Sequence, residues 1–245
     1  MIKITNFSKS YAKSEVKAVN NVNLTVNSGE IFGFLGPNGA GKTTTLKAIT
    51  GVLDFTEGKI EIDGHDIKTD GLNAKKKIGY VSDNGVIYEK LTGREYIDFL
   101  ADIYGVDKET RKKRAEKMLE DFSLTDAFDK PISSYSRGMK QKISVIGALI
   151  HDPQVWLLDE PMTGLDPQSS FKLKQMMKEH CAQGKTVFFS THVLEVAEKL
   201  CDRVGIIVKG ELKVVGSIDE VLKMKGDESL EEVFLSTVSG EDNNE

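Results

Sequence analysis

Short apolar segments divided by turn residues fill the first part of the chain and are typical of β-strands. Two of them span 2–7 and 16–26, and a third, apolar apart from one glycine, spans 31–35 before a run of glycines. From Lys42 the apolar positions recur at helical spacing until Gly51 ends the pattern. The sequence therefore predicts a buried strand, a glycine-rich loop and a helix in direct succession.

Charged residues and helical periodicity replace this pattern between about 84 and 150. One predicted helix opens with a capping box, in which Thr92 and Glu95 stand at the N-cap and N3 positions. A second helix, from about 108 to 122, places its apolar positions on one face. We interpret this region as a helical insertion.

Strands and helices alternate again after the insertion. The segments 155–158 and 186–189 are strand-like, and the helical segment 168–182 lies between them with Gly184 beyond its end. Alternation of this kind is typical of a parallel sheet with helices on its faces. We therefore predict an α/β fold with a mainly parallel sheet, and an antiparallel β subdomain formed by the first strands.

The predicted organisation is a single domain with one inserted subdomain and a short tail. The final residues are small, polar and acidic, which favours disorder. The predicted ranges are a single domain over 1–238, its core over about 1–83 and 151–225, a helical subdomain over about 84–150, a C-terminal helix over about 229–238 and a disordered tail over 239–245.

Composition and charge argue against two classes of protein. With 245 residues, 39% of them hydrophobic, the chain can bury the core of one large domain. Its net charge of -5 argues against sequence-independent nucleic-acid binding, which needs a surplus of Lys and Arg, so we expect no nucleic-acid partner. No stretch approaches the roughly 18 apolar residues of a membrane span, and the N-terminus lacks the apolar core of a signal peptide. We therefore expect a cytoplasmic protein.

The glycine-rich loop carries the first candidate chemistry. Its sequence, Gly-Pro-Asn-Gly-Ala-Gly-Lys-Thr, has two glycines separated by four residues and then Lys and Thr, which is the phosphate-binding-loop pattern. Glycines let successive backbone N–H groups point inward, and the helix that follows favours an anion. Lys42 can reach the β- and γ-phosphates, and the Thr43 hydroxyl can bind Mg²⁺. The predicted nucleotide-binding residues are Gly36, Pro37, Asn38, Gly39, Ala40, Gly41, Lys42, Thr43 and Thr44.

Two carboxylates end a later apolar strand. Asp159 and Glu160 follow the segment 155–158, which places them at the carboxyl edge of the predicted sheet, where α/β proteins bind ligands. Alone, a strand ending in two acids is ordinary. Beside a phosphate-binding loop, Asp159 is a candidate Mg²⁺ ligand, and Glu160 can orient and polarise an attacking water.

A further segment, Tyr-Ser-Arg-Gly-Met-Lys-Gln at 135–141, precedes this pair by about twenty residues. With it, almost the whole chain resembles the nucleotide-binding subunits of ATP-binding-cassette (ABC) transporters, a phosphate-loop NTPase fold. The family signature is typically Leu-Ser-Gly-Gly-Gln, so Ser136 and Gly138 match it while Arg137 and Met139 depart. Taken alone, Ser136 is an N-cap at the start of a helix. The resemblance implies that Ser136 and Gly138 contact the ATP of the opposite subunit in a homodimer.

Other matches occur in the order that the family has them. The segment Gly-Leu-Asp at 164–166 resembles the D-loop, and Ser-Thr-His at 190–192 resembles the switch segment. The resemblance implies that His192 senses the γ-phosphate and supports the attack by water, so the implied catalytic residues are Lys42, Glu160 and His192. A lone histidine or Gly-Asp turn would otherwise be read as structural.

Two positions carry less direct matches. Tyr11 occupies the place of the family's aromatic residue that stacks on adenine, although alone it reads as a partly buried tyrosine. Asp83 stands where the family usually has Gln in contact with Mg²⁺ and water. A carboxylate can still coordinate Mg²⁺, so Asp83 is a candidate metal ligand beside Thr43 and Asp159.

The resemblance implies an ATP-hydrolysing motor subunit that uses ATP and Mg²⁺. Two copies would close on two ATP molecules and drive a separate transmembrane permease, which holds them on the inner face of the membrane. The segments 91–95 and 229–234 resemble those of exporters for drugs, antibiotics, lipids or ions. The helical insertion, including 84–95, would dock on the permease.

Two alternatives remain open at this point. One is a soluble ABC-type mechanochemical ATPase that acts on DNA or the ribosome, although such relatives usually carry two cassettes in one chain or long coiled-coil insertions. The other is a nucleotide-dependent regulator with little turnover, if Asp83 and the altered signature impair hydrolysis.

Overall fold

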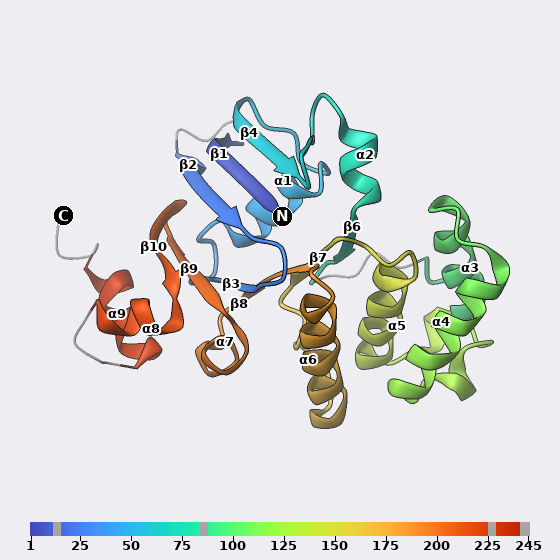
Figure 1. Cartoon of the computed structure of the whole chain (residues 1–245). Coiled ribbons are helices and arrows are strands. Elements are labelled where there is room, and N and C mark those ends of the chain that lie inside the picture. Colours follow the sequence, from blue (N-terminus) through green and yellow to red (C-terminus); the bar gives the residue numbers. More distant parts are fainter. Residues whose placement is uncertain (12–15, 84–87, 225–228, 241–245) are drawn as a thin grey trace.

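A mostly parallel sheet forms the centre of the molecule (Figure 1). The computed structural model describes residues 1–11, 16–83, 88–224 and 229–240. Within them the central sheet has the strand order β10-β9-β3-β8-β7-β6. Its strands are β3 (Ile31–Leu35), β6 (Ile78–Val81), β7 (Val155–Asp159), β8 (Thr186–Thr191), β9 (Arg203–Val208) and β10 (Glu211–Ser217). All neighbours pair in parallel except β9 and β10, so the predicted mainly parallel sheet is confirmed.

The first strands form a second, antiparallel sheet with the order β2-β1-β4-β5 (Figure 1). Its strands are β1 (Ile2–Ser10), β2 (Lys17–Val26), β4 (Glu57–Ile62) and β5 (His65–Asp66), followed by helix α2 (Gly71–Lys76). In β2 the buried positions alternate with exposed or half-buried ones because one face lies on the core. The predicted antiparallel subdomain is thus confirmed.

Helices cover both faces of the central sheet, which explains why β3, β7 and β8 are buried along their whole length. Helix α1 (Lys42–Ile49) packs against β2 and β4 on one side and β7 on the other, so it lies between the two sheets. Helices α6 (Pro167–Ala182) and α7 (Leu194–Leu200) pack against β3, and α6 also packs against β8. The start of α1 is therefore held from both sides.

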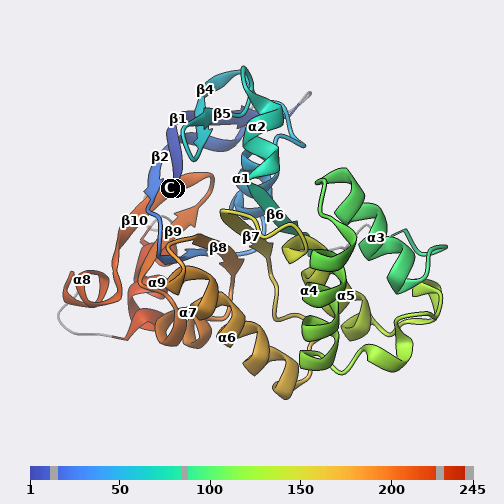
Figure 2. The same cartoon turned by 45° about the vertical axis from the view of Figure 1, so that its right-hand side comes forward.

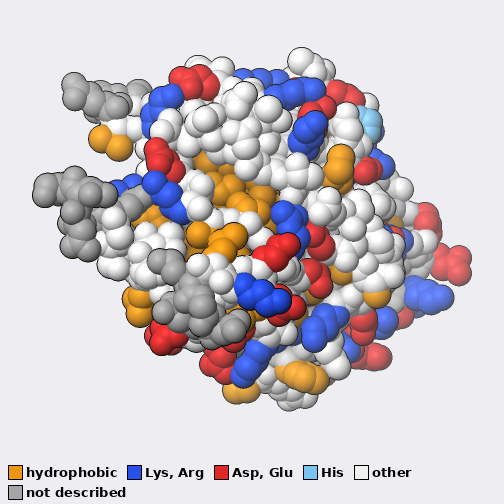
Figure 3. All heavy atoms as spheres, turned by 60° about the vertical axis from the view of Figure 1, so that its left-hand side comes forward, with side chains coloured by type: hydrophobic (Ala, Val, Ile, Leu, Met, Phe, Trp, Pro, Cys, Tyr) orange, Lys and Arg blue, Asp and Glu red, His pale blue; other side chains and the backbone are white. Residues whose placement is uncertain are grey.

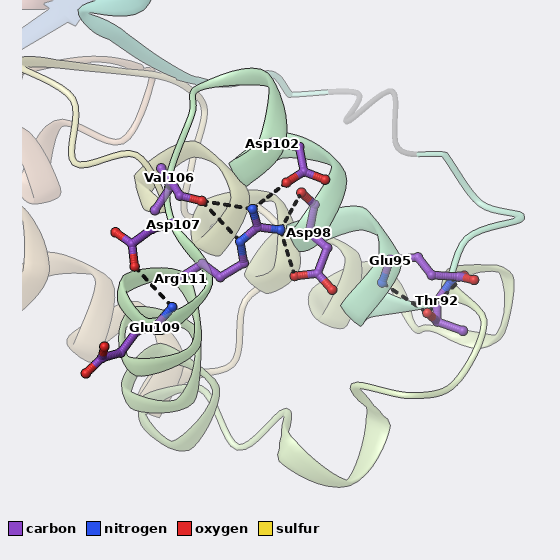
Figure 4. A network of polar contacts seen from close by, with 8 residues as sticks. All are labelled: Thr92, Glu95, Asp98, Asp102, Val106, Asp107, Glu109 and Arg111. Atoms are coloured by element: carbon purple, nitrogen blue, oxygen red, sulfur yellow. Dashed lines mark hydrogen bonds and ion pairs between the residues drawn. The ribbon is translucent and has the colours of Figure 1, made fainter.

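The helical insertion forms a lobe at the β6 side of the sheet (Figure 2). It contains α3 (Gly93–Ile103), α4 (Lys108–Asp121) and α5 (Arg137–Leu149), with 3₁₀ turns at Thr125–Ala127 and Ile132–Ser134. The predicted capping box at Thr92 and Glu95 is confirmed (Figure 4). In the same view Arg111 of α4 donates to the Val106 carbonyl and pairs with Asp98 of α3 at 3.3 Å, which ties the two helices together.

The C-terminal part packs on the opposite edge of the sheet. Helices α8 (Ile218–Lys223) and α9 (Leu230–Ser239) share a core with Leu35, Val204 and Ile206. Seen from this side, the surface has apolar side chains near its centre and charged ones around them (Figure 3). Helix α9, Leu230–Ser239, lies within one residue at each end of the predicted C-terminal helix over about 229–238.

A capping box and two buried anchors account for the start of this helix. Ser229 and Glu232 cap its start, and Leu230 and Val233 are buried. The rest of the predicted tail, 241–245, and the start of the predicted insertion, 84–87, lie outside the described residues. No helix in the described ranges combines the length and the apolar character that crossing a bilayer requires.

Candidate active site

The phosphate-binding loop (residues 36–43) joins the end of β3 to the start of α1 in a curve that only glycine permits at two positions. A Cβ on Gly36 would lie 2.4 Å from the carbonyl oxygen of Ile207. Gly41 has a φ of 109°, and a Cβ there would lie 2.7 Å from the carbonyl oxygen of Ala18. Both contacts are with backbone and cannot relax cheaply. The tight curve that the sequence predicted is therefore imposed by close packing.

The N-terminus of α1 is left open on the loop. Its N-cap, Gly41, has no side chain, and within the described part of the chain no side chain caps the helix. The first N–H groups of any helix lack partners inside it, and the helix dipole is positive at this end. The Thr43 side chain is exposed beside them. This end of α1 can therefore accept an anion such as a phosphate.

Lys42 is the charged group that lines the loop from inside. Its side chain is only 7% exposed. The ammonium donates to the carbonyl oxygens of Gly36 at 2.6 Å and Pro37 at 3.3 Å, and lies 3.7 Å from Oε1 of Glu160. The lysine is thus held across the mouth of the loop, between the predicted phosphate site and the predicted general base.

Asp159 ends β7 with one oxygen bonded and one free. Its residue is 1% exposed, and Oδ1 accepts a hydrogen bond from the Ser190 hydroxyl at 2.6 Å. Oδ2 is buried and has no hydrogen-bond partner among the described residues. A buried carboxylate oxygen without a partner is costly, and Mg²⁺ prefers oxygen ligands. The residues present therefore fit a magnesium ion at this oxygen.

Glu160 follows at the turn after β7, in a backbone conformation that is rare for a residue with a Cβ. Its φ is 48°, in the left-handed region. The carboxylate is largely buried, and its Oε2 lies 3.0 Å from Nδ1 of His192 at the end of β8. The imidazole is 58% exposed. Lys42, Glu160 and His192, which are far apart in sequence, thus form one line of contacts.

Tyr11 and Asp83 lie at the margins of this group. Tyr11 is 45% exposed, and its hydroxyl is 3.1 Å from the hydroxyl of Thr44 in α1. Asp83 is half-buried just after β6. Burial, together with Asp159 and Asp83, raises the pKa of the Tyr80 phenol well above its usual range. The roles of Tyr11 and Asp83 stay predictions.

Ser136 and Gly138 belong to a different part of the surface. Helix α5 packs against β6, α3 and α4, whereas α1 packs against β2, β4 and β7. Ser136 is exposed and caps α5, because its hydroxyl accepts from the N–H of Met139 at 3.2 Å. The predicted N-cap is confirmed. Its predicted contact with a nucleotide needs a second copy of the chain.

The D-loop segment packs directly on the start of α5. A Cβ on Gly138 would lie 2.8 Å from the carbonyl oxygen of Gly164. Asp166 caps α6 through the N–H of Ser169 at 2.8 Å and pairs with Lys142 of α5 at 2.9 Å. Hydrogen bonds from Ser169 hold the pKa of the Asp166 carboxyl well below its usual range. The segment after Glu160 therefore packs against α5.

One residue of the site has no role in the sequence-based prediction. Ser190 was noted only as part of the switch segment, yet it contacts both Asp159 and the backbone of Glu160. The available signal was a hydroxyl residue directly after the apolar run 187–189, in the strand next to the one that ends in the two acids. Only the parallel register brings these positions side by side.

Comparisons with known proteins agree with this geometry. The ABC transporter family profile matches residues 19–163. The ABC transporter ATP-binding protein NatA of Bacillus subtilis is 35% identical over 96% of this chain and 97% of its own length. The linearmycin resistance ATP-binding protein LnrL of Bacillus subtilis is 36% identical over 98% of this chain and 76% of its own. An uncharacterised Nostoc ABC transporter ATP-binding protein is 39% identical, over 86% of this chain and 63% of its own, so the chain spans less than two thirds of that relative.

Solved structures of ATP-binding cassettes also resemble this chain. One, described as an ATP-binding subunit of an ABC transporter, superimposes with a TM-score of 0.92 at 30% identity, over 96% of this chain and 98% of its own. Another is an ATP-binding cassette in a dimeric post-hydrolysis state with ADP and Pi bound. Its TM-score is 0.80 at 30% identity, over 89% of this chain and 98% of its own.

Proposed function

Because the chain belongs to the ABC transporter family and is an ATP-hydrolysing motor subunit of it, we propose that the loop 36–43, Asp159, Glu160 and His192 form its catalytic half-site. The observation that carries this proposal is the line of contacts from Lys42 through Glu160 to His192. It joins a phosphate-binding lysine, a carboxylate and an imidazole at one edge of the sheet. Each has the chemistry of one step of phosphoryl transfer to water.

The residues have distinct proposed roles. The loop's N–H groups and Lys42 bind the β- and γ-phosphates and stabilise the charge that develops on them. Glu160 orients and polarises the attacking water, and His192 contacts the γ-phosphate and holds Glu160 in place. Tyr11, beside Thr44, is proposed to stack on the adenine.

Magnesium is proposed as the metal cofactor. Thr43 and Asp159 would hold it, with Asp83 as a further candidate ligand, and the ion would neutralise charge between the β- and γ-phosphates. The unpartnered Oδ2 of Asp159 supports this assignment. The exposed hydroxyl of Thr43, at the open end of α1, supports it as well.

Two copies of the chain are proposed to form a homodimer with two ATP molecules between them. Ser136 and Gly138 of each copy would face the γ-phosphate held by the other. The dimeric cassette with ADP and Pi supports this arrangement. Because the γ-phosphate binds only the closed dimer tightly, its arrival closes the pair and its loss reopens it.

A separate transmembrane permease is the proposed partner, with the chain bound to it on the inner face of the membrane and the helical insertion as the docking part. Export is the proposed direction, supported by the likeness to the linearmycin resistance protein LnrL. Co-purification from detergent-solubilised membranes tests this. Recovery of a polytopic membrane protein is expected, and recovery only in a free cytosolic fraction bound to ribosomes or DNA would favour a mechanochemical ATPase instead.

Glu160→Gln tests the catalytic proposal. Loss of a general base lowers turnover by on the order of 10²-fold or more, while the neutral side chain keeps the volume and removes charge near the phosphates. The variant should accumulate as an ATP-bound dimer in size-exclusion chromatography with light scattering. Glu179→Gln, at an acidic position of α6 away from the loop, is the matched control and should hydrolyse ATP normally. Unchanged turnover in Glu160→Gln would refute the assigned role.

A further inference from the structure

The hydroxyl of Ser190 contacts both acidic residues of the site. Ser190 is fully buried in β8, and the parallel register sets it beside Asp159 of β7. Its Oγ donates to Oδ1 of Asp159 at 2.6 Å and accepts from the backbone N–H of Glu160 at 3.1 Å. One hydroxyl therefore joins the proposed metal ligand to the backbone of the proposed general base.

The hydrogen bond from Ser190 to Asp159 fixes the orientation of the Asp159 carboxylate. Rotation of a carboxylate about its terminal bond exchanges its two oxygens. The bond from Ser190 to Oδ1 opposes that rotation and leaves Oδ2 as the buried oxygen without a partner in the described part of the chain. Hydrogen bonds to a ligating carboxylate orient it and tune its affinity for metal. Ser190 thus fixes the plane of the carboxylate and the direction in which its second oxygen faces a cation.

The second bond supports the unusual backbone of Glu160. A left-handed conformation is unfavourable for a residue with a Cβ and persists only where its surroundings hold it. Ser190 accepts the N–H of Glu160, while the carbonyl oxygen of Glu160 accepts from the N–H of Thr163 at 3.2 Å. Held at both ends, the turn directs the carboxylate between Lys42 and His192.

We propose that Ser190 is a positioning residue for ATP hydrolysis, whose hydroxyl sets Asp159 toward Mg²⁺ and holds Glu160 toward the attacking water. This inference rests on the proposed roles of those two acids. Ser190 does not touch the nucleotide in the proposal. It acts through the two residues that do.

Metal binding gives a readout that does not depend on turnover. Mn²⁺ serves as the probe, and its binding to the ADP-bound chain is followed by the loss of the free-ion signal in electron paramagnetic resonance. Ser190→Ala should weaken Mn²⁺ binding by about 10- to 100-fold and lower kcat by a similar factor, because outer partners of metal ligands have effects of that size. ATP binding in EDTA should not change. Ser190→Thr, which keeps the hydroxyl, should retain Mn²⁺ binding.

Thr186→Ala is the matched control for loss of a buried hydroxyl. Thr186 is fully buried at the other end of β8, and its Oγ1 donates to the carbonyl oxygen of Asn27 at 3.0 Å. This variant should bind Mn²⁺ like the wild type. If Ser190→Ala does not fold, as judged by circular dichroism and thermal melting, Ser190→Cys replaces it, because a thiol is only a weak donor. The same loss of Mn²⁺ affinity is then expected.

Asp159→Asn separates this inference from the proposed function. If Asp159→Asn binds Mn²⁺ normally, the metal role of Asp159 is wrong. If Asp159→Asn loses affinity while the folded Ser190 variant keeps it, only the role of Ser190 is refuted. An equal loss of Mn²⁺ binding in Thr186→Ala would also overturn it, because the effect would then belong to β8 as a whole.

Discussion

Helices α1 and α5 each present an N-terminus to the proposed nucleotide chemistry, but they begin in different ways. Helix α1 follows Gly41, which has no side chain, and its first residue, Lys42, is 7% exposed. Helix α5 follows Ser136, whose hydroxyl already accepts from the N–H of Met139, and both Ser136 and the first helical residue, Arg137, are exposed. The N-terminus of α1 thus has no side-chain cap among the described residues, and its first side chain is buried. The N-terminus of α5 has a side-chain cap and is exposed.

The difference fits the proposal that one site is divided between two molecules. Within one chain, α1 has Asp159, Glu160 and His192 around it, so it can hold and activate a phosphate. Helix α5 has instead the segment 164–166 packed on its start, which fixes its direction but adds no acid–base group that the proposed mechanism uses. An exposed, preformed helix end is suited to contact a partner that arrives already loaded with ATP.

Removing Lys42, the first residue of α1, should have the largest effect. Lys42→Ala takes away the buried charge that faces the phosphates, and we expect kcat to fall by on the order of 10²- to 10³-fold, as when a donor to a developing charge is lost. A coupled ATPase assay measures it. Lys47→Ala is the matched control, because Lys47 is an exposed lysine in the last turn of the same helix. Comparable loss in both variants would mean that the effect does not depend on the buried charge that lines the loop.

Mixing two inactive variants tests the division itself. Lys42→Ala inactivates the phosphate-binding part of the site at the start of α1. Ser136→Arg places a bulky side chain at the start of α5 and blocks that part. If each site combines both ends from different copies, a mixed dimer contains one intact site, and random pairing of independent sites restores activity to about a quarter of wild type. The measurement is ATPase activity of an equimolar mixture after ATP-driven assembly. Complete inactivity of the mixture, with heterodimers detected by crosslinking, would argue for sites within single chains.

The close contact between Gly138 of α5 and Gly164 predicts an effect of intermediate size, on stability. In Gly138→Ala the new Cβ meets the carbonyl oxygen of Gly164 at 2.8 Å, so we expect the free energy of unfolding to fall by about 1–3 kcal/mol. Urea denaturation followed by circular dichroism measures it. Gly71→Ala is the control, because a Cβ there meets no heavy atom of the described residues within 4 Å. A neutral Gly138→Ala would show that α5 and the D-loop segment are not rigidly packed.

The cap of α5 should give the smallest effect. Ser136→Ala removes the acceptor for the N–H of Met139, and such a loss costs about 1 kcal/mol of stability, whereas Ser136→Gly costs only a few tenths. Thermal melting of both variants measures the difference. Binding of ATP to the single chain should be unchanged in both, because the cap lies on the other helix. Weaker ATP binding without dimer formation would contradict the separation of the two ends.

Features of the two helix ends that depend on one short stretch of sequence could mostly be predicted. The strand, glycine loop and helix over 31–51 were predictable because spacing and motif lie in one stretch, and so were the caps at Thr92 and Ser136. The C-terminal helix was predicted over about 229–238 and runs from Leu230 to Ser239, a difference of one residue at each end.

What the sequence could not supply depends on neighbours that the fold brings together. The bond from Ser190 to Asp159 crosses 31 positions of the chain and requires the register of two parallel strands. The contact of Gly138 with Gly164 likewise follows from how α5 sits on the segment after Glu160. The direction of the Glu160 backbone has no signature in residue type, because glutamate is not a residue that favours a left-handed conformation.

That backbone has a consequence for anyone who engineers this protein for heat resistance. A residue with a Cβ pays roughly 1–2 kcal/mol for a left-handed conformation that glycine adopts freely. Glu160→Gly would relieve that strain and delete the proposed catalytic carboxylate in one step. A library selected only for survival at high temperature is therefore expected to enrich glycine or asparagine at this position and to return robust proteins that no longer turn over ATP. Such a selection must therefore also assay ATP hydrolysis, or keep residue 160 as glutamate.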